Sequence, residues 1–149
     1  PEVRWRSYIA LIQLGEIKGD TQGLLNLLVR MSADYPANTT IKNDLAYLQG
    51  LLNTNIPEAR KAADDLVKSH PEIPAHHVTL ALCMIREGQL NEAESLLDEL
   101  NLQWDRALPG WKAVRIHLLK HAGRKQEAGI LLEGLNQEAL KPEEVGLLN

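Results

Sequence analysis

The strongest constraint on the fold of this 149-residue chain is an internal repeat with a period of 34 to 35 residues. Small or apolar residues mark it at Leu24, Ala59, Ala93 and Ala128, which are 35, 34 and 35 positions apart. Four and seven residues after each anchor stand further apolar side chains, namely Leu28, Ala63, Leu97, Leu132, Met31, Leu66, Leu100 and Leu135. Because these offsets fall on one face of an α-helix, each period is predicted to contain an amphipathic helix.

A turn and an earlier helix are predicted ahead of each of these helices. The turns are indicated by Gly19-Asp20, Asn53-Thr54-Asn55, Gly88-Gln89 and Gly123-Arg124. The earlier helices carry corresponding packing residues at Ile12, Ala46, Ala81 and Ile116. Pro36 and Pro71 end the first two units, since proline stops a helix. We therefore expect one array over residues 1–149, with units at about 5–38, 39–73, 74–108 and 109–142 and a partial terminal helix after them.

Composition excludes several classes of protein. The longest apolar run, residues 80–85, is far shorter than the roughly 20 residues of a membrane span, so no membrane insertion is expected. A single cysteine, Cys83, offers no internal disulfide and no cysteine cluster for zinc or iron-sulfur. The 16 basic residues against 20 acidic ones argue against a surface built to neutralise phosphates. Because the chain starts at Pro1, we expect it to be part of a larger or processed protein, with cytoplasm and periplasm both left open.

The third unit carries a set of residues that resembles the tetratricopeptide repeat family, namely Leu80-Ala81, Met84, Gly88, Leu90 and Ala93. The resemblance extends over about four repeats and nearly the whole chain. It implies an all-α protein, an α-solenoid of helix-turn-helix repeats that forms a right-handed superhelix. The bulky Ile12 and Leu24 stand where the family prefers small residues, so wider helix separation is expected in the first unit.

The resemblance also implies a concave groove lined by the first helix of each unit. Nine residues of these helices form the predicted partner-binding groove, with apolar residues at its centre and polar ones at its rim: Ile9, Gln13, Asn43, Tyr47, Val78, Leu82, Ile85, His117 and Lys120. Such a groove suits a peptide or helix of a protein partner. The alternative is that Val78, Leu82 and Ile85 pack against a neighbouring helix, the terminal helix or a second copy of the chain. Asp44 stands where chaperone-tail binders of this family carry a carboxylate clamp, so no such clamp is predicted.

No residue pattern indicates an enzyme, a cofactor or a metal. His117 and His121 lie four apart, but Leu118 stands where the zinc enzymes with this spacing place a glutamate. Cys83 lies in the most apolar helix, where burial raises the pKa of a thiol and makes it unreactive. Glu92, Glu94, Asp98 and Glu99 are predicted to form a solvated convex face, and Trp104 and Trp111 to fill the irregular junction before the fourth unit.

The sequence is compatible with three functional hypotheses. The leading hypothesis is a non-enzymatic protein-protein interaction scaffold. The second is single-stranded RNA binding, because pentatricopeptide repeats have about the same period, although the acidic balance counts against it. The third is an accessory region of a larger enzyme, such as a glycosyltransferase, or of a secretion component. The sequence does not indicate the partner or the oligomeric state.

Overall fold

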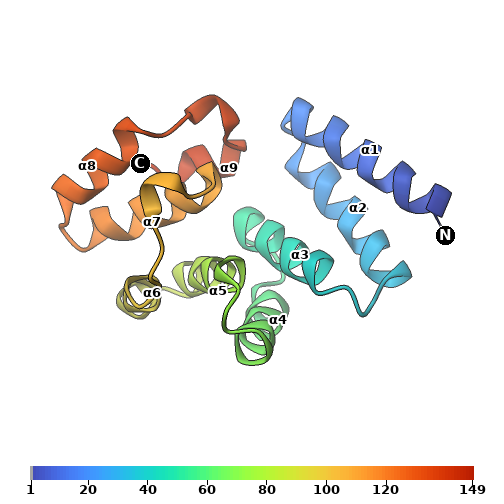
Figure 1. Ribbon diagram of the computed structural model, residues 1–149, viewed down its shortest axis with the longest axis horizontal. Coiled ribbons are helices and arrows are strands. Elements are labelled where there is room, and N and C mark those ends of the chain that lie inside the picture. The colour runs from blue at the N-terminus through green and yellow to red at the C-terminus, as the bar shows by residue number, and fades with distance from the viewer. Residues whose placement is uncertain (1) are drawn as a thin grey trace.

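The computed structural model describes residues 2–149 and is helical over most of that range, with no strand in it. Four antiparallel pairs follow one another: α1 (Glu2–Lys18) with α2 (Thr21–Asp34), α3 (Thr39–Leu52) with α4 (Ile56–Ser69), α5 (Pro74–Arg86) with α6 (Leu90–Asp98), and α7 (Pro109–His121) with α8 (Lys125–Glu133). A short helix α9 (Pro142–Gly146) and two 3₁₀ turns, η1 (Trp104–Arg106) and η2 (Gln137–Ala139), complete the described chain. From α1 to α8, each helix packs against the next along a curved array (Figure 1), so the predicted all-α class and α-solenoid are confirmed.

Local sequence explains where the helices begin and end. The Asp20 side chain accepts a hydrogen bond from Gly23 N–H at 2.9 Å and caps α2, and Asn38 caps α3 through Ile41 N–H. Three of the four intra-pair turns contain a glycine with positive φ, namely Gly19, Gly88 and Gly123. The longer turn between α3 and α4 instead places Asn53 and Asn55 in the left-handed region, with φ of 52° and 50°.

The core runs along the whole array. Small residues at two repeat anchors, Ala59 and Ala93, and at the packing position Ala81 are fully buried and let neighbouring helices approach closely. Helix α5 lies in the middle and contacts α3, α4, α6 and α7, so most of its residues are buried. Helix α1 contacts α2 and buries none of its residues. None of the described helices has the length and hydropathy of a membrane span.

The C-terminal segment, residues 136–149, turns back onto the array. Its helix α9 lies on the inner side of the curve, where it contacts α7 and α3 (Figure 1). Leu147 and Leu148 after it are buried in the core. The predicted terminal helix is therefore present, but it covers the concave side instead of continuing the stack.

Candidate binding site on the concave side

The structure brings four of the nine predicted groove residues to the inner face. Asn43 and Tyr47 of α3 line a cavity there. The other two hold the C-terminal segment by its main chain, since His117 Nδ1 lies 3.0 Å from the carbonyl oxygen of Leu147 and Lys120 Nζ donates to the carbonyl oxygen of Leu148. The α7 end of the predicted groove is therefore occupied by the protein's own chain.

Val78, Leu82 and Ile85 do not form an exposed apolar wall. All three are buried in the core, because the first helices α3, α5 and α7 pack directly against one another. These residues pack against neighbouring helices, which was the alternative drawn from the sequence. The expectation that they are accessible in the groove is wrong. Residues 80–85 form an unbroken apolar run around α5, and a helix that is apolar all round is buried.

On α1 the inward residues differ from the predicted ones. Ile9 and Gln13 are exposed and do not line the cavity, whereas Ile12 and Glu16 of the same helix do. The prediction took Ile12 as the residue that packs within the unit. Because α1 is covered on one side only, Ile12 instead faces the cavity while remaining in contact with the core.

The cavity has a volume of about 450 Å³ and lies between the first unit and the C-terminal segment. Residues of α1, α2, α3, α5 and α7, with η2 and α9, contribute to it. Its apolar lining consists of Ile12, Leu24, Leu28, Leu48, Ala75, Leu108, Pro109, Trp111 and Ala139. Its polar lining consists of Glu16, Asn43, Asp44, Tyr47, Thr79, Lys141 and Glu144. A largely apolar wall with a few polar groups is typical of ligand pockets of this size.

Half-buried Tyr47 and buried Glu144 link α3 to the C-terminal segment. The Tyr47 hydroxyl donates to Glu144 Oε2 at 2.6 Å, and Lys141 N–H donates to Glu144 Oε1 at 2.8 Å. Burial, together with the adjacent Glu144 carboxylate, raises the pKa of Tyr47 well above its ordinary value, so the phenol stays a donor. A Cβ at Gly110 would lie 2.0 Å from Glu144 Oε2, so only glycine leaves room for this contact.

Two further contacts join the C-terminal segment to the first unit. Thr21 Oγ1 donates to Glu143 Oε2 at 3.2 Å, and Lys141 Nζ lies 3.9 Å from Glu16 Oε1. The segment therefore reaches from the fourth unit across the concave side to the first. No pattern in the sequence indicated these contacts, because their partners lie more than 100 positions apart.

The acidic side of the cavity centres on Asp44. Burial raises the pKa of its carboxyl group above the ordinary value, while the hydrogen bond from Asn43 and the positive charge of Lys141 lower it. Asn43 Oδ1 and Thr79 Oγ1 are buried and have no hydrogen-bond partner. Asn43 and Thr79 line the cavity, but these two oxygen atoms are themselves buried away from solvent.

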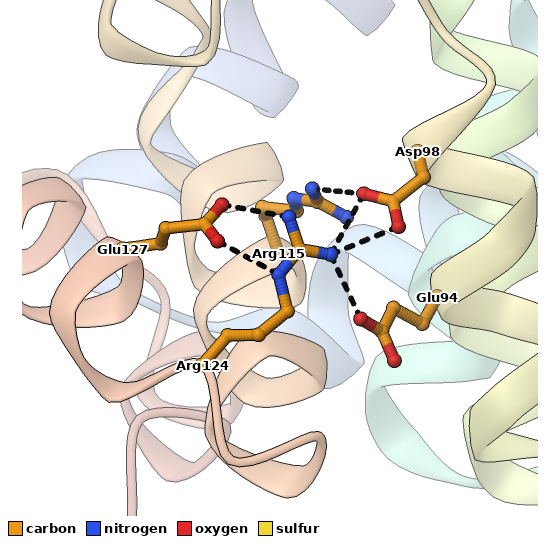
Figure 2. A network of polar contacts seen from close by, with 5 residues as sticks. All are labelled: Glu94, Asp98, Arg115, Arg124 and Glu127. Atoms are coloured by element: carbon orange, nitrogen blue, oxygen red, sulfur yellow. Dashed lines mark hydrogen bonds and ion pairs between the residues drawn. The ribbon is translucent and has the colours of Figure 1, made fainter.

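The predicted solvated face of α6 is in part an ion-pair network (Figure 2). Arg124 Nη1 lies 2.8 Å from both Glu94 Oε1 and Asp98 Oδ2, and the same guanidinium makes two bonds to Glu127. Arg115 also pairs with Asp98. The prediction missed this because the arginines belong to the next unit, and the network therefore ties α6 to α7 and α8.

Aromatic and sulfur side chains serve packing. Trp104 is half-buried against the core, with the Arg115 guanidinium 5.4 Å from its ring centre, and half-buried Trp111 lines the cavity. Burial, more than the nearby Glu87, raises the pKa of the Cys83 thiol to about 12, as predicted for an unreactive buried cysteine. Among residues 2–149, no group of three or more His, Cys, Asp or Glu side chains is arranged to hold a metal ion.

Comparison with known proteins gives no match to a protein-family model, to a curated protein or to a solved structure. The assignment to the tetratricopeptide repeat family therefore stays a prediction that rests on the repeat residues of this sequence.

Proposed function

We propose that this protein is a non-enzymatic interaction scaffold that binds a peptide or short helix of a protein partner on its concave side. The observation that carries the proposal is that this side already holds a peptide segment, the C-terminal residues 136–149. His117 and Lys120 bond to main-chain carbonyls of that segment, and the half-buried Tyr47 bonds to its Glu144 side chain. A groove that holds a short helix of its own chain in this way offers the contacts by which helices bind in trans.

The open part of the cavity is the proposed place of binding. It lies beside the C-terminal segment and is walled by α1, α2 and α3, with Ala75 and Thr79 of α5 at its base. Apolar side chains of a partner would enter there, and Asn43 and Asp44 supply polar contacts that fix the orientation of the bound segment.

Charge favours a protein partner over RNA. The cavity lining contains three carboxylates, those of Glu16, Asp44 and Glu144, and one ammonium group, that of Lys141. A phosphate backbone would be repelled there, since RNA binding relies on neutralising phosphates. The accessory role in a larger enzyme or secretion protein is a setting in which such a scaffold would work, and it stays a prediction.

A selection from a peptide library tests the proposal on the full chain. We expect selected peptides to bind with micromolar affinity and the Ala75→Arg variant, which places a long side chain in the cavity, to weaken them at least about tenfold. Ile130→Arg on the exposed face of α8 is the matched control and should leave binding unchanged. Circular dichroism checks that both variants are folded. Equal binding to folded Ala75→Arg, or a selection that yields no peptide, would contradict the proposal.

A further inference from the structure

We propose that the site under the C-terminal segment binds a partner peptide of the same pattern, and that the segment occupies this site as an internal competitor. The pattern is two glutamates at the start of a short helix and two leucines one turn later, as in Glu143-Glu144 and Leu147-Leu148. The inference rests on the proposed scaffold function and adds to it the chemistry of the partner and the contact that regulates binding.

The side chains that anchor the segment share one face of α9 and its last turn. Glu144, Leu147 and Leu148 are buried, whereas Val145 and Gly146 between them are exposed. Offsets of three and four residues place the anchors together on a helix. A competing peptide therefore needs this spacing to make the same contacts.

Two hydroxyl groups of the array bind the glutamates. The Tyr47 hydroxyl donates to Glu144 Oε2 at 2.6 Å. The Thr21 hydroxyl donates to Glu143 Oε2 at 3.2 Å. Gly110 leaves room for the first of these carboxylates, since a Cβ there would lie 2.0 Å from Glu144 Oε2. The site therefore favours a carboxylate in the first turn of the bound helix, because an ionised acceptor forms the stronger bond.

Two side chains of α7 bind the other end of the segment. Lys120 Nζ donates to the carbonyl oxygen of Leu148, and His117 Nδ1 lies 3.0 Å from that of Leu147. A carbonyl oxygen only accepts, so Nδ1 carries the proton in this contact. The last carbonyls of a helix have no partner within it, so these two contacts select the end of a helix. Selection for sequence comes from the glutamates and leucines.

The segment is held by few buried groups. Residues 136–139 are exposed, and the three anchors are the only buried residues in 136–149. The Glu144 carboxylate is bonded by the Tyr47 hydroxyl and the Lys141 N–H, which are both uncharged donors. A buried carboxylate bonded in this way keeps part of its desolvation cost. We expect the segment to open at a lower free energy than the core, which lets a peptide replace it.

The segment lowers the apparent affinity of any competing peptide. It is joined to α8 by a short link, residues 134–141, so its local concentration at the site is of millimolar order. The affinity of a peptide falls in proportion to the fraction of molecules in which the site is open. Weakening the segment's own contacts must therefore strengthen the binding of a peptide in trans.

A fluorescein-labelled peptide of residues 138–149, titrated into the full chain, tests this competition. Leu147→Asp in the chain places a carboxylate where a leucine is buried and should detach the segment. The peptide should then bind at least about tenfold more tightly than it binds the wild type. Val145→Asp, on the exposed side of the same helix, is the matched control and should leave the affinity unchanged. Equal affinities for the wild type and folded Leu147→Asp overturn the proposal.

Changes in the peptide test the pattern. A Glu144→Gln peptide should bind the Leu147→Asp chain at least about fivefold more weakly than the wild-type peptide, because it loses the ionised acceptor. A Val145→Ala peptide should bind equally well. In the chain, adding Lys120→Met to Leu147→Asp should also weaken binding, since the bond to the last carbonyl is lost. Equal binding of the Glu144→Gln peptide overturns the assigned chemistry.

Hydrogen exchange of the wild type is a measurement that needs no variant. The amides of Glu144, Leu147 and Leu148 bond to carbonyls within the segment. They should exchange at least about tenfold faster than the amides of α5, because local opening of the segment exposes them. Exchange at the rate of α5, through global unfolding alone, overturns the proposal.

The peptide-library selection separates this inference from the scaffold proposal. Selected peptides that bind the wild type and Leu147→Asp equally would leave the scaffold standing and refute the role of the segment. No binding of library peptides or of the 138–149 peptide would refute both. A wild-type dimer at high concentration that Leu147→Asp abolishes would assign the site to a second copy of the chain and overturn the assignment to a partner protein.

Discussion

The two terminal units of the array bury their first helices to different extents. Helices α1 and α7 are each the first helix of a terminal unit, with Ile12 and Ile116 in corresponding places. Helix α7 buries seven residues, because α6 and α8 flank it and the C-terminal segment covers its inner face. Helix α1 buries none, and Ile17 remains 84% exposed. Membership in the repeat therefore does not determine how firmly a helix is held; the number of neighbours that cover it does.

The polar contacts at the two ends also differ, because those at the C-terminal end are less exposed and more numerous. At the C-terminal end, the hydrogen bond from Tyr47 to Glu144 is partly buried and Arg124 joins three carboxylates. At the N-terminal end, Tyr8 donates to Asp34 at the same distance of 2.6 Å, but the bond is exposed, and Arg4 makes a single exposed ion pair with Asp34. The pairs allow matched substitutions at the two ends.

The largest difference is expected for leucines at equivalent places, two residues after Ile116 and Ile12. Leu118→Ala in α7 should lower the free energy of unfolding by about 2–5 kcal/mol, since it leaves a cavity in a fully packed core. Leu14→Ala in α1 should change it by less than about 0.5 kcal/mol, because that side chain is half exposed. Urea unfolding measures both values, and similar losses would remove the contrast between the ends.

The second difference concerns the two tyrosine hydroxyls. Tyr47→Phe leaves Glu144, which is 3% exposed, without one donor, and should cost about 1–3 kcal/mol. Tyr8→Phe should cost less than about 0.5 kcal/mol, because water replaces the lost donor to Asp34. Limited proteolysis provides an independent measurement. The C-terminal segment should be cleaved faster in Tyr47→Phe than in Tyr8→Phe, and equal rates would count against a role of this bond in holding the segment.

The third difference concerns how much Arg124 and Arg4 contribute to stability through their ion pairs. Arg124→Ala should destabilise the protein by about 1 kcal/mol at low salt, with a smaller effect in 1 M NaCl, because a partly exposed network is screened. Arg4→Ala should have almost no effect at either ionic strength. Thermal midpoints at the two salt concentrations test this pair, and an Arg124 effect that does not depend on salt would mean that the side chain acts by packing.

The smallest effect is expected from pH. Burial pulls the pKa of Asp98 upward, but the hydrogen bonds and charges of Arg115 and Arg124 outweigh it and lower that pKa. A carboxyl group with a lowered pKa stabilises the fold above the ordinary Asp value of about 4 and loses this contribution as pH falls below it. Acid titration should therefore destabilise the wild type more than Asp98→Asn. Parallel curves would show that other carboxyl groups determine the acid response.

The sequence predicted the helices and turns because their signals are local. Apolar spacing gave the paired helices, and Gly19, Gly88 and Gly123 marked turns that need a positive φ. The side of each helix that faces solvent was harder to predict. Residues 80–85 of α5 are apolar without a break, so no spacing could show that Val78 and Leu82 are covered. Helix α9 has five residues, and its position depends on contacts such as Tyr47 with Glu144, which are 97 positions apart.

The position of the C-terminal segment has a mechanical consequence. A solenoid in which each unit contacts only its neighbours extends elastically when its ends are pulled apart. Here the bond from Thr21 to Glu143 and the approach of Lys141 to Glu16 fasten the first unit to the tail of the last. Tension applied to the two ends must separate these contacts before the coil can lengthen, so the molecule should extend in two stages, stiff at first and elastic afterwards.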